Sequence, residues 1–412
     1  MAAADSGPPR RQGGEGGQRA ESSGGIPVAI QPLAGLRVLD LSRLLPGPYA
    51  TLVLADLGAD VIKIEAPEGG DYLRWMPPLT GKVSWAFFAL NAGKRSVAID
   101  LKKPEGVATL RALAKDADVL VESFRPGVME RLGLGYEALA ADNPGLVYCA
   151  LTGFGQTGPY REAPGHDLNY MALAGALGLG GPADRAPQVL PVQVADIGGS
   201  LWSLVAILAA LVARQTSGRG RFLDVSMTDG VTGFLTAALA PYFGTAGASA
   251  PPSRGNDVLT GGQACYNVYA AKDGGFLAAA PLEPKFWLAF CQRVGHPEWA
   301  KRQFDPSLKA EVEALFLTKT RAEWEAVFAG SEACVEPVLT AGELASHPLH
   351  VARGLIIESE GLRRLRTPTR HPDAPAAGKA PGLGEHTRQV LAEAGLSDAQ
   401  IDQLVAAGVV KT

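Results

Sequence analysis

Short apolar runs alternate with amphipathic stretches through the first half of this chain. The runs have the length and the Val, Ile and Leu content of buried strands, and helical patterns at 50–57 and 104–117 separate several of them. Strands that alternate with helices favour a mostly parallel sheet. We therefore predict an α/β fold with a Rossmann-like large domain. Its strands are expected at 36–41, 60–65, 96–101, 119–121, 145–152 and 222–225.

The pattern changes after the last of these strands. A helix is predicted from there to about residue 239, and a Gly-, Pro- and Ser-rich stretch at 244–262 marks a boundary. Short strands mixed with amphipathic helices follow and predict a smaller α+β domain. We expect four parts: a disordered tail at 1–32, the large domain at 33–225, a linker and small domain at 226–350, and a return segment at 351–412 that completes the large domain.

Composition and charge narrow the classes of function. The net charge of −4 argues against a protein that binds nucleic acid through its phosphates. Four scattered cysteines without a CxxC pair favour reduced thiols over zinc sites or disulfides. The apolar run at 197–213, about 17 residues, is shorter than a membrane span and predicts a buried core helix. The tail lacks the apolar segment of a secretory signal, so we expect a cytoplasmic protein.

The segment 165–170, Gly-His-Asp-Leu-Asn-Tyr, is the strongest candidate for chemistry. It sets the imidazole of His166 beside the carboxylate of Asp167 at the start of an apolar helical run, where backbone N–H groups can stabilise an oxyanion. A second carboxylate, Asp196, opens the next helical run, and Glu283 begins another. Asp196 and Glu283 could be simple helix caps. Alternatively, His166 and Asp196 could flank one substrate carbon and move a proton between its two faces.

Two further patterns concern phosphate groups. Residues 153–158 match GxGxxG, but Pro159 and Pro164 follow, so the motif predicts a turn rather than a dinucleotide site. Basic residues that we place after predicted strands, Lys94, Arg95, Arg125 and Arg131, are either ordinary surface charge or a phosphate pocket beyond the carboxyl ends of the strands. Phe124 beside Arg125 is suited to packing on an adenine ring.

Four segments together resemble the class III CoA-transferase superfamily, which also contains the α-methylacyl-CoA racemases. They are 57–65 (LGADVIKIE), 93–96 (GKRS), 124–127 (FRPG) and 384–387 (GEHT). The resemblance implies a CoA thioester substrate and no metal or redox cofactor. It also implies an interlocked homodimer whose sites form between the large domain of one chain and the small domain of the other. The CoA moiety is then expected to contact Lys94, Arg95, Ser123, Phe124, Arg125, Arg131 and Leu132.

The segment at 165–170 is similar to the racemase form of this superfamily. That similarity implies that His166 and Asp196 act as two bases, that Glu283 orients His166 and that the N–H of Asp167 binds an enolate. In the transferases the residue before the Asp is usually aromatic or apolar, and the Asp is a nucleophile. Ala66 stands where the racemases carry an arginine near the CoA phosphates, a transferase-like feature. CoA transfer through Asp167 and non-catalytic acyl-CoA binding are the alternatives.

Overall fold

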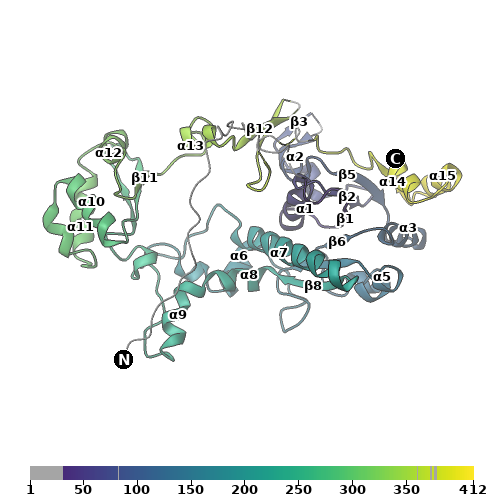
Figure 1. Ribbon diagram of the computed structural model, residues 1–412, viewed down its shortest axis with the longest axis horizontal. Helices are drawn as coiled ribbons and strands as arrows, with labels where there is room; N and C mark the ends of the chain where they lie inside the picture. Colours follow the sequence, from purple (N-terminus) through teal and green to yellow (C-terminus); the bar gives the residue numbers. More distant parts are fainter. Residues whose placement is uncertain (1–30, 82, 360, 372–373, 375–377) are drawn as a thin grey trace, which may run out of the picture.

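The computed structural model describes residues 31–81, 83–359, 361–371, 374 and 378–412. The predicted disordered tail therefore lies outside the described residues, except for its last two positions. Figure 1 shows two bodies: a large one built around a central sheet and a smaller one formed by α10, α11, α12 and β11. Extended stretches lead from the large body to the small one and back again.

The central sheet confirms the predicted mostly parallel arrangement. Its strand order is β14-β5-β2-β1-β6-β7-β8, and every neighbouring pair is parallel except β14 with β5. β14 comes from the end of the chain, so the return segment contributes to this sheet. The strands are β1 (Arg37–Asp40), β2 (Asp60–Glu65), β5 (Arg95–Ile99), β6 (Val119–Glu122), β7 (Val147–Thr152), β8 (Arg221–Ser226) and β14 (Val410–Lys411).

Helices cover both faces of this sheet because successive strand residues point to opposite sides. On β1, Val38 packs into one core with α1 and α7, whereas Leu39 packs into a second core with α3, α5, α14 and α15. Both residues are almost completely buried. The helices are α1 (Pro46–Asp56), α3 (Pro104–Ala114), α5 (Tyr136–Asp142), α7 (Val194–Ser217), α14 (Thr387–Glu393) and α15 (Asp398–Ala406).

α1 and α7 differ from the sequence expectation in where they begin and end. α1 begins at Pro46, four residues earlier than predicted, because proline is tolerated in the first turn of a helix, where its missing N–H has no partner to lose. α7 contains the predicted core helix and extends well beyond it. By length and composition α7 could cross a membrane, but half of its apolar window is buried inside the molecule, where it packs on β7, β8 and α1.

The small body has its own core. An antiparallel sheet of order β11-β10-β9 packs on three helices, and Trp287, Phe290, Phe316 and Trp324 are fully buried between them. The strands are β9 (Asn267–Ala270), β10 (Phe276–Ala279) and β11 (Val335–Pro337), and the helices are α10 (Pro284–Val294), α11 (Leu308–Phe316) and α12 (Arg321–Phe328).

Shorter elements complete the described chain. The helix predicted after β8 is divided at Leu235 into two helices. The remaining elements are α2 (Trp85–Asn91), α4 (Val128–Arg131), α6 (Asp167–Leu173), α8 (Met227–Phe234), α9 (Thr236–Gly244), α13 (Pro348–Ala352), the hairpin β3 (Leu79–Thr80) with β4 (Val83–Ser84), and the hairpin β12 (Ile356–Ser359) with β13 (Leu362–Leu365).

Candidate active site

The carboxylate of Asp167 joins the starts of two helices. Its Oδ1 accepts hydrogen bonds from the backbone N–H of Ala195 at 2.6 Å and of Asp196 at 3.1 Å. These N–H groups belong to the first turn of α7, where no earlier carbonyl can pair with them. Asp167 is itself the first residue of α6. The first turns of α6 and α7 are therefore held against each other.

His166 precedes α6 and is positioned by the backbone around it. Its N–H donates to Oδ1 of Asn169 at 3.0 Å, which closes the first turn of the helix. The hydroxyl of Tyr170 donates to the carbonyl of Gly165 at 2.5 Å. A Cβ atom at Gly165 would lie only 2.6 Å from the Tyr170 ring, so glycine is required there. The His166 side chain is exposed in the single chain.

Two adjoining cavities are each lined by both His166 and Asp196. The larger has a volume of about 730 Å³ and is lined by loops that follow β1, β6 and β7, at the carboxyl edge of the sheet. This is the edge at which open parallel sheets bind ligands. The smaller, of about 280 Å³, is mainly apolar and is lined by Leu168, Met171, Leu177, Val189 and Leu190 besides polar groups.

Asp196 has an unusual acidity. Partial burial and the nearby Asp167 carboxylate raise its pKa to about 6, and His166 only partly opposes them. Each influence has a simple cause, since burial and a like charge both disfavour the ionised form of an acid. A carboxyl group with such a pKa can accept and return a proton near neutral pH. Asp196 is therefore suited to acid–base chemistry rather than only to starting a helix.

Four of the seven predicted CoA-binding residues line the larger or the third cavity of the site, and three do not. Ser123, Phe124 and Arg125 follow β6 and line the larger cavity, as expected for residues at the carboxyl edge. Leu132 and Phe124 line a third cavity of about 250 Å³. Arg131 lies on α4 with its side chain exposed.

Lys94 and Arg95 have other partners. Lys94 is buried, forms an ion pair with Asp40 at 3.0 Å and donates to Oγ1 of Thr51 at 2.7 Å. Burial lowers its pKa to about 8 although Asp40 opposes the shift. Arg95 pairs with Asp60 and Glu393. The sequence reasoning placed both residues after a strand, but Lys94 lies just before β5 and Arg95 is the first residue of that strand. The structure does not bring either one to the three cavities described above.

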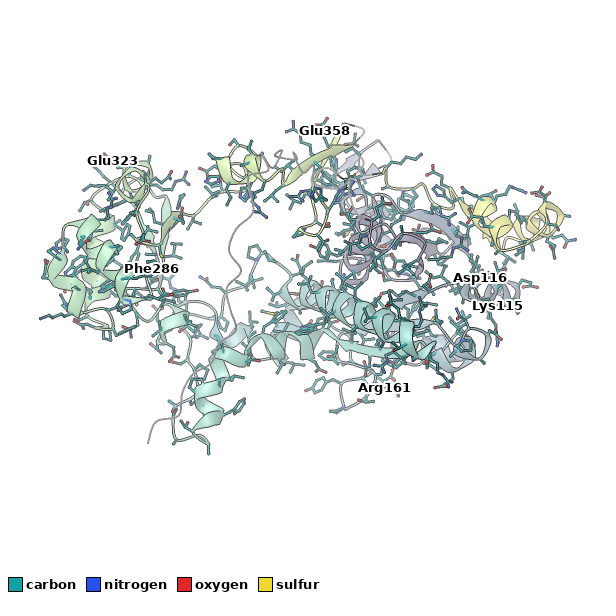
Figure 2. All side chains as sticks on the ribbon, in the orientation of Figure 1. Lys115, Asp116, Arg161, Phe286, Glu323 and Glu358 are labelled. Carbon is teal, nitrogen blue, oxygen red and sulfur yellow. The ribbon has the colours of Figure 1, made fainter. Side chains whose placement is uncertain are left out.

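Glu283 also lies away from His166 within one chain. It precedes α10 in the small body. Figure 2 shows Phe286 of the same helix at one end of the molecule, whereas Arg161, which lines the larger cavity, lies beneath the central sheet. The fold of one chain thus brings His166, Asp167 and Asp196 together and leaves Glu283 apart.

The GxGxxG segment is a turn, as predicted. Gly155 and Gly158 have φ of +84° and +86°, and no helix begins on them; the next helix is α6. A Cβ at Gly153 would lie 2.3 Å from the Tyr170 ring. Gly153 lines the larger cavity, where the absence of a side chain leaves room for Tyr170.

Sequence reasoning missed several residues of the wall of the larger cavity, among them Arg43, Tyr72 and Arg161. Arg43 had a detectable signal, because it closely follows the first predicted strand and carries a charge. Tyr72 lies in a short 3₁₀ turn that no periodic pattern indicates.

The chain is similar to known proteins over most of its length. The sequence profile of CoA-transferase family III matches residues 33–387. Alpha-methylacyl-CoA racemase of Homo sapiens is 38% identical over 382 residues, which covers 90% of this chain and 96% of the relative. Succinate–glutarate CoA-transferase of Agrobacterium fabrum is 36% identical over 398 residues, with 89% and 97% covered. A crystal structure of a CaiB/BaiF family protein from Brucella suis has a TM-score of 0.77 at 35% identity, covering 88% of this chain and 99% of that one. The chain therefore belongs to CoA-transferase family III.

Proposed function

We propose that this protein racemises 2-methylacyl-CoA thioesters at the carbon next to the thioester carbonyl. The observation that carries the proposal is that two different proton acceptors, His166 and Asp196, line the same two cavities. The family relationship supports an acyl-CoA substrate, and one of the similar proteins is a racemase. The same relationship is nearly as close to a CoA-transferase, so the distinction depends on the site.

The proposed reaction moves one proton off the carbon and another onto its opposite face. As His166 takes the proton from one epimer, the C–H electron pair moves into the enolate. Asp196, in its protonated form, then gives its proton to the opposite face of the carbon. For the other epimer the roles reverse. The thioester carbonyl oxygen accepts the negative charge that the removed proton leaves behind. The substrate is therefore neither oxidised nor reduced. The N–H of Asp167 at the start of α6 is the proposed donor to the enolate oxygen.

The Asp167 carboxylate has a positioning role in this proposal. Its Oδ1 already accepts two backbone hydrogen bonds from α7, which favours a structural function over a nucleophilic one. In CoA transfer the same carboxylate would attack the thioester, forming an anhydride and then an aspartyl-CoA thioester. That attack would require Oδ1 to release α7 or the second oxygen to react.

The two cavities suit the two ends of the substrate. The apolar lining of the smaller cavity fits an acyl chain, which gains stability when it leaves water. The larger cavity opens toward the basic residues Arg43, Arg125 and Arg161 and fits the CoA end.

We further propose that Glu283 reaches His166 from a second copy of the chain. His166 is exposed in the single chain, and Glu283 begins a helix in the separate small body. A homodimer that places the small body of one copy over the cavities of the other would cover His166 and complete the site.

Incubation of each pure epimer of a 2-methylacyl-CoA in D₂O tests the function. We expect deuterium at the carbon next to the carbonyl and loss of chirality. A requirement for a second carboxylic acid, together with an adduct at Asp167 that hydroxylamine traps, would instead establish CoA transfer.

A further inference from the structure

Arg43 lies at the junction of two cavities. It follows β1 in the loop that leads to α1, and it lines both the larger cavity and the third cavity of about 250 Å³. Phe124 is the other residue common to the two linings. A ligand that extends from one cavity into the other must therefore pass Arg43.

The guanidinium of Arg43 forms no ion pair with any residue that the structure describes. Among the described residues, no carboxylate lies within ion-pair distance of its guanidinium, and the acidic neighbour Glu65 is paired with Arg74 at 2.6 Å. The guanidinium instead lies over the rings of Phe124 and Tyr72, at 5.4 and 5.7 Å from their centroids. Aromatic contacts hold an arginine in place and leave its N–H donors available to an anion.

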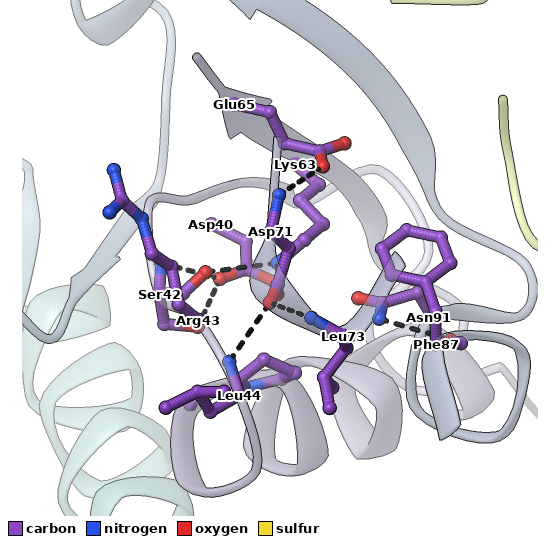
Figure 3. A network of polar contacts seen from close by, with 12 residues as sticks. Asp40, Ser42, Arg43, Leu44, Lys63, Glu65, Asp71, Leu73, Phe87 and Asn91 are labelled. Carbon is purple, nitrogen blue, oxygen red and sulfur yellow. Dashed lines mark hydrogen bonds and ion pairs between the residues drawn. The ribbon is translucent and has the colours of Figure 1, made fainter. Parts of the chain in front are cut away.

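The backbone around Arg43 is fixed by a buried ion pair. Lys63 and Asp71 lie 3.0 Å apart with fully buried side chains. Lys63 donates to the carbonyl of Ser42 at 2.9 Å, and Asp71 accepts from the N–H of Leu44 at 3.2 Å. Figure 3 shows these contacts on the two neighbours of Arg43, whose own side chain points away from the network.

The backbone conformation of Leu44 also indicates that the loop around Arg43 is held in a fixed shape. Its φ is +62°, in the left-handed region that residues with a Cβ rarely adopt. Such a conformation persists only where the surroundings over-determine it. The loop is thus held in an uncommon shape that presents Arg43 to the junction.

The shape of a CoA thioester matches this arrangement. Its thioester is joined through pantetheine to a diphosphate, and the diphosphate is joined to adenosine. The proposed bases line the larger cavity. The third cavity has a mainly apolar lining that includes Leu41, Ile64 and Leu101 and suits a nucleobase, and its charged lining residues besides Arg43 are Glu65, Asp100 and Lys102. With the thioester near His166 and adenine in the third cavity, the diphosphate lies at the junction.

We propose that Arg43 binds the diphosphate of the CoA thioester and so determines that the substrate is a CoA ester rather than a shorter pantetheine ester. Ala66 lines the third cavity without offering a charge, and Lys102 lines that cavity alone, whereas Arg43 is the basic residue common to both linings. The proposal rests on the acyl-CoA substrate of the proposed function, but it holds equally for a racemase and for a transferase.

The test is a comparison of ligands that differ only in their phosphates. For Arg43→Gln we expect the dissociation constants of CoA and of dephospho-CoA, measured by calorimetry, to rise about 10- to 100-fold, the range for a lost charged hydrogen bond. The affinity for pantetheine, followed by ligand-observed NMR, should not change. The matched control Arg219→Gln removes an exposed arginine at the opposite edge of the sheet and should leave all three affinities unchanged.

Two results would overturn the assignment. One is an unchanged affinity for dephospho-CoA, because it would place Arg43 on the 3′-phosphate or on no phosphate. The other is an equal loss for pantetheine, because it would indicate distortion of the site. If Arg43→Gln does not fold, Arg43→Lys gives the same comparison and should weaken both diphosphate ligands by a smaller factor, since lysine lacks the planar fork of arginine. All these measurements are of binding, so failure of the proposed racemisation would not affect them.

Discussion

Oδ1 of Asp167 accepts a hydrogen bond of 3.1 Å from the backbone N–H of Asp196. This contact relates the two carboxylates of the site in two ways. It holds the first turn of α7, so that Asp196 lines the same cavities as His166. It also places a negative charge near Asp196, which contributes to raising the pKa of that group to about 6. One residue therefore both positions its neighbour and adjusts its acidity.

Substitutions of Asp167 distinguish its effects on the position and the pKa of Asp196 from a role as the nucleophile. Asp167→Asn retains an acceptor oxygen for α7 but removes the charge, so the pKa of Asp196 should fall and the acidic limb of the pH profile of kcat/KM should move to lower pH. Asp167→Ala should in addition lower the free energy of unfolding by about 1 kcal/mol, as for a lost helix cap. A measured loss of all activity in Asp167→Asn with an unmoved melting temperature would support a nucleophile instead.

The pKa of Asp196 also predicts how activity depends on pH. Asp196 must be ionised to take a proton, so kcat/KM for one epimer should fall as the pH drops below about 6. In Asp196→Asn the turnover of that epimer should be lost. Initial rates for each epimer between pH 5 and pH 8 measure this directly. A limb near the ordinary pKa of a carboxyl group would show that Asp196 is not the base.

The raised pKa of Asp196 also predicts that the ionised carboxylate lowers the free energy of unfolding at neutral pH. The folded pKa of Asp196 lies above its unfolded value, so the folded state binds the proton more tightly. Stability attached to this group is present below the unfolded pKa of 3.8 and is lost as the pH rises through about 6. After allowance for partial exposure, Asp196→Asn should raise the free energy of unfolding at pH 8 by roughly 1 to 2 kcal/mol. Urea denaturation at pH 8 and pH 4 should show the gain only at the higher pH.

Lys94 should behave as a structural residue. Its removal in Lys94→Met leaves the Asp40 carboxylate buried without its ion pair, which typically costs about 3 to 5 kcal/mol of folding free energy. The exposed Lys115, labelled in Figure 2, provides the control Lys115→Met, which should change stability by less than about 0.5 kcal/mol. A stable Lys94→Met protein with a raised KM would restore the original expectation that Lys94 binds CoA.

Complementation tests whether Glu283 acts between copies of the chain. His166→Ala and Glu283→Ala should each be inactive alone. Mixed dimers of the two variants contain one site with an intact His166 from one copy and an intact Glu283 from the other, so part of the activity should return after co-refolding. If both residues served one site within a single chain, no mixture could recover activity.

The strands and the site motif were largely predictable from the sequence, because each depends on local pattern. Apolar runs of strand length predicted the parallel sheet, and the residues at 165–170 predicted the start of α6. Lys94 and Arg95 were expected after a strand, although they precede the apolar run at 96–101 and the sequence order already shows this. Their ion pairs with Asp40, Asp60 and Glu393 could not be predicted, because these partners come from distant parts of the chain. Glu283 and His166 lie in two bodies that are joined by long connections. The hydrophobic pattern of a sequence does not predict how such connections place two bodies.

Arg43 shows a different limit. The charge of Arg43 and its place after a strand are visible in the sequence. Its proposed ability to bind a diphosphate depends on the buried ion pair of Lys63 with Asp71 and on the left-handed backbone of Leu44. Lys63 and Asp71 lie 20 and 28 positions after Arg43 in the chain (63 − 43 = 20; 71 − 43 = 28). Only the packing of the β1 and β2 ends brings them together.

Isotope exchange, measured for each epimer separately, tests whether His166 and Asp196 act on opposite faces of the reacting carbon. Wild-type protein in D₂O should convert each pure 2-methylacyl-CoA epimer into the other with deuterium at the reacting carbon. His166→Gln should exchange only one epimer without inverting it, and Asp196→Asn should exchange only the opposite epimer, because each variant keeps one base. Equal exchange of both epimers in either variant, or inversion by the wild type with full retention of hydrogen, would contradict a reaction that uses His166 and Asp196 on opposite faces.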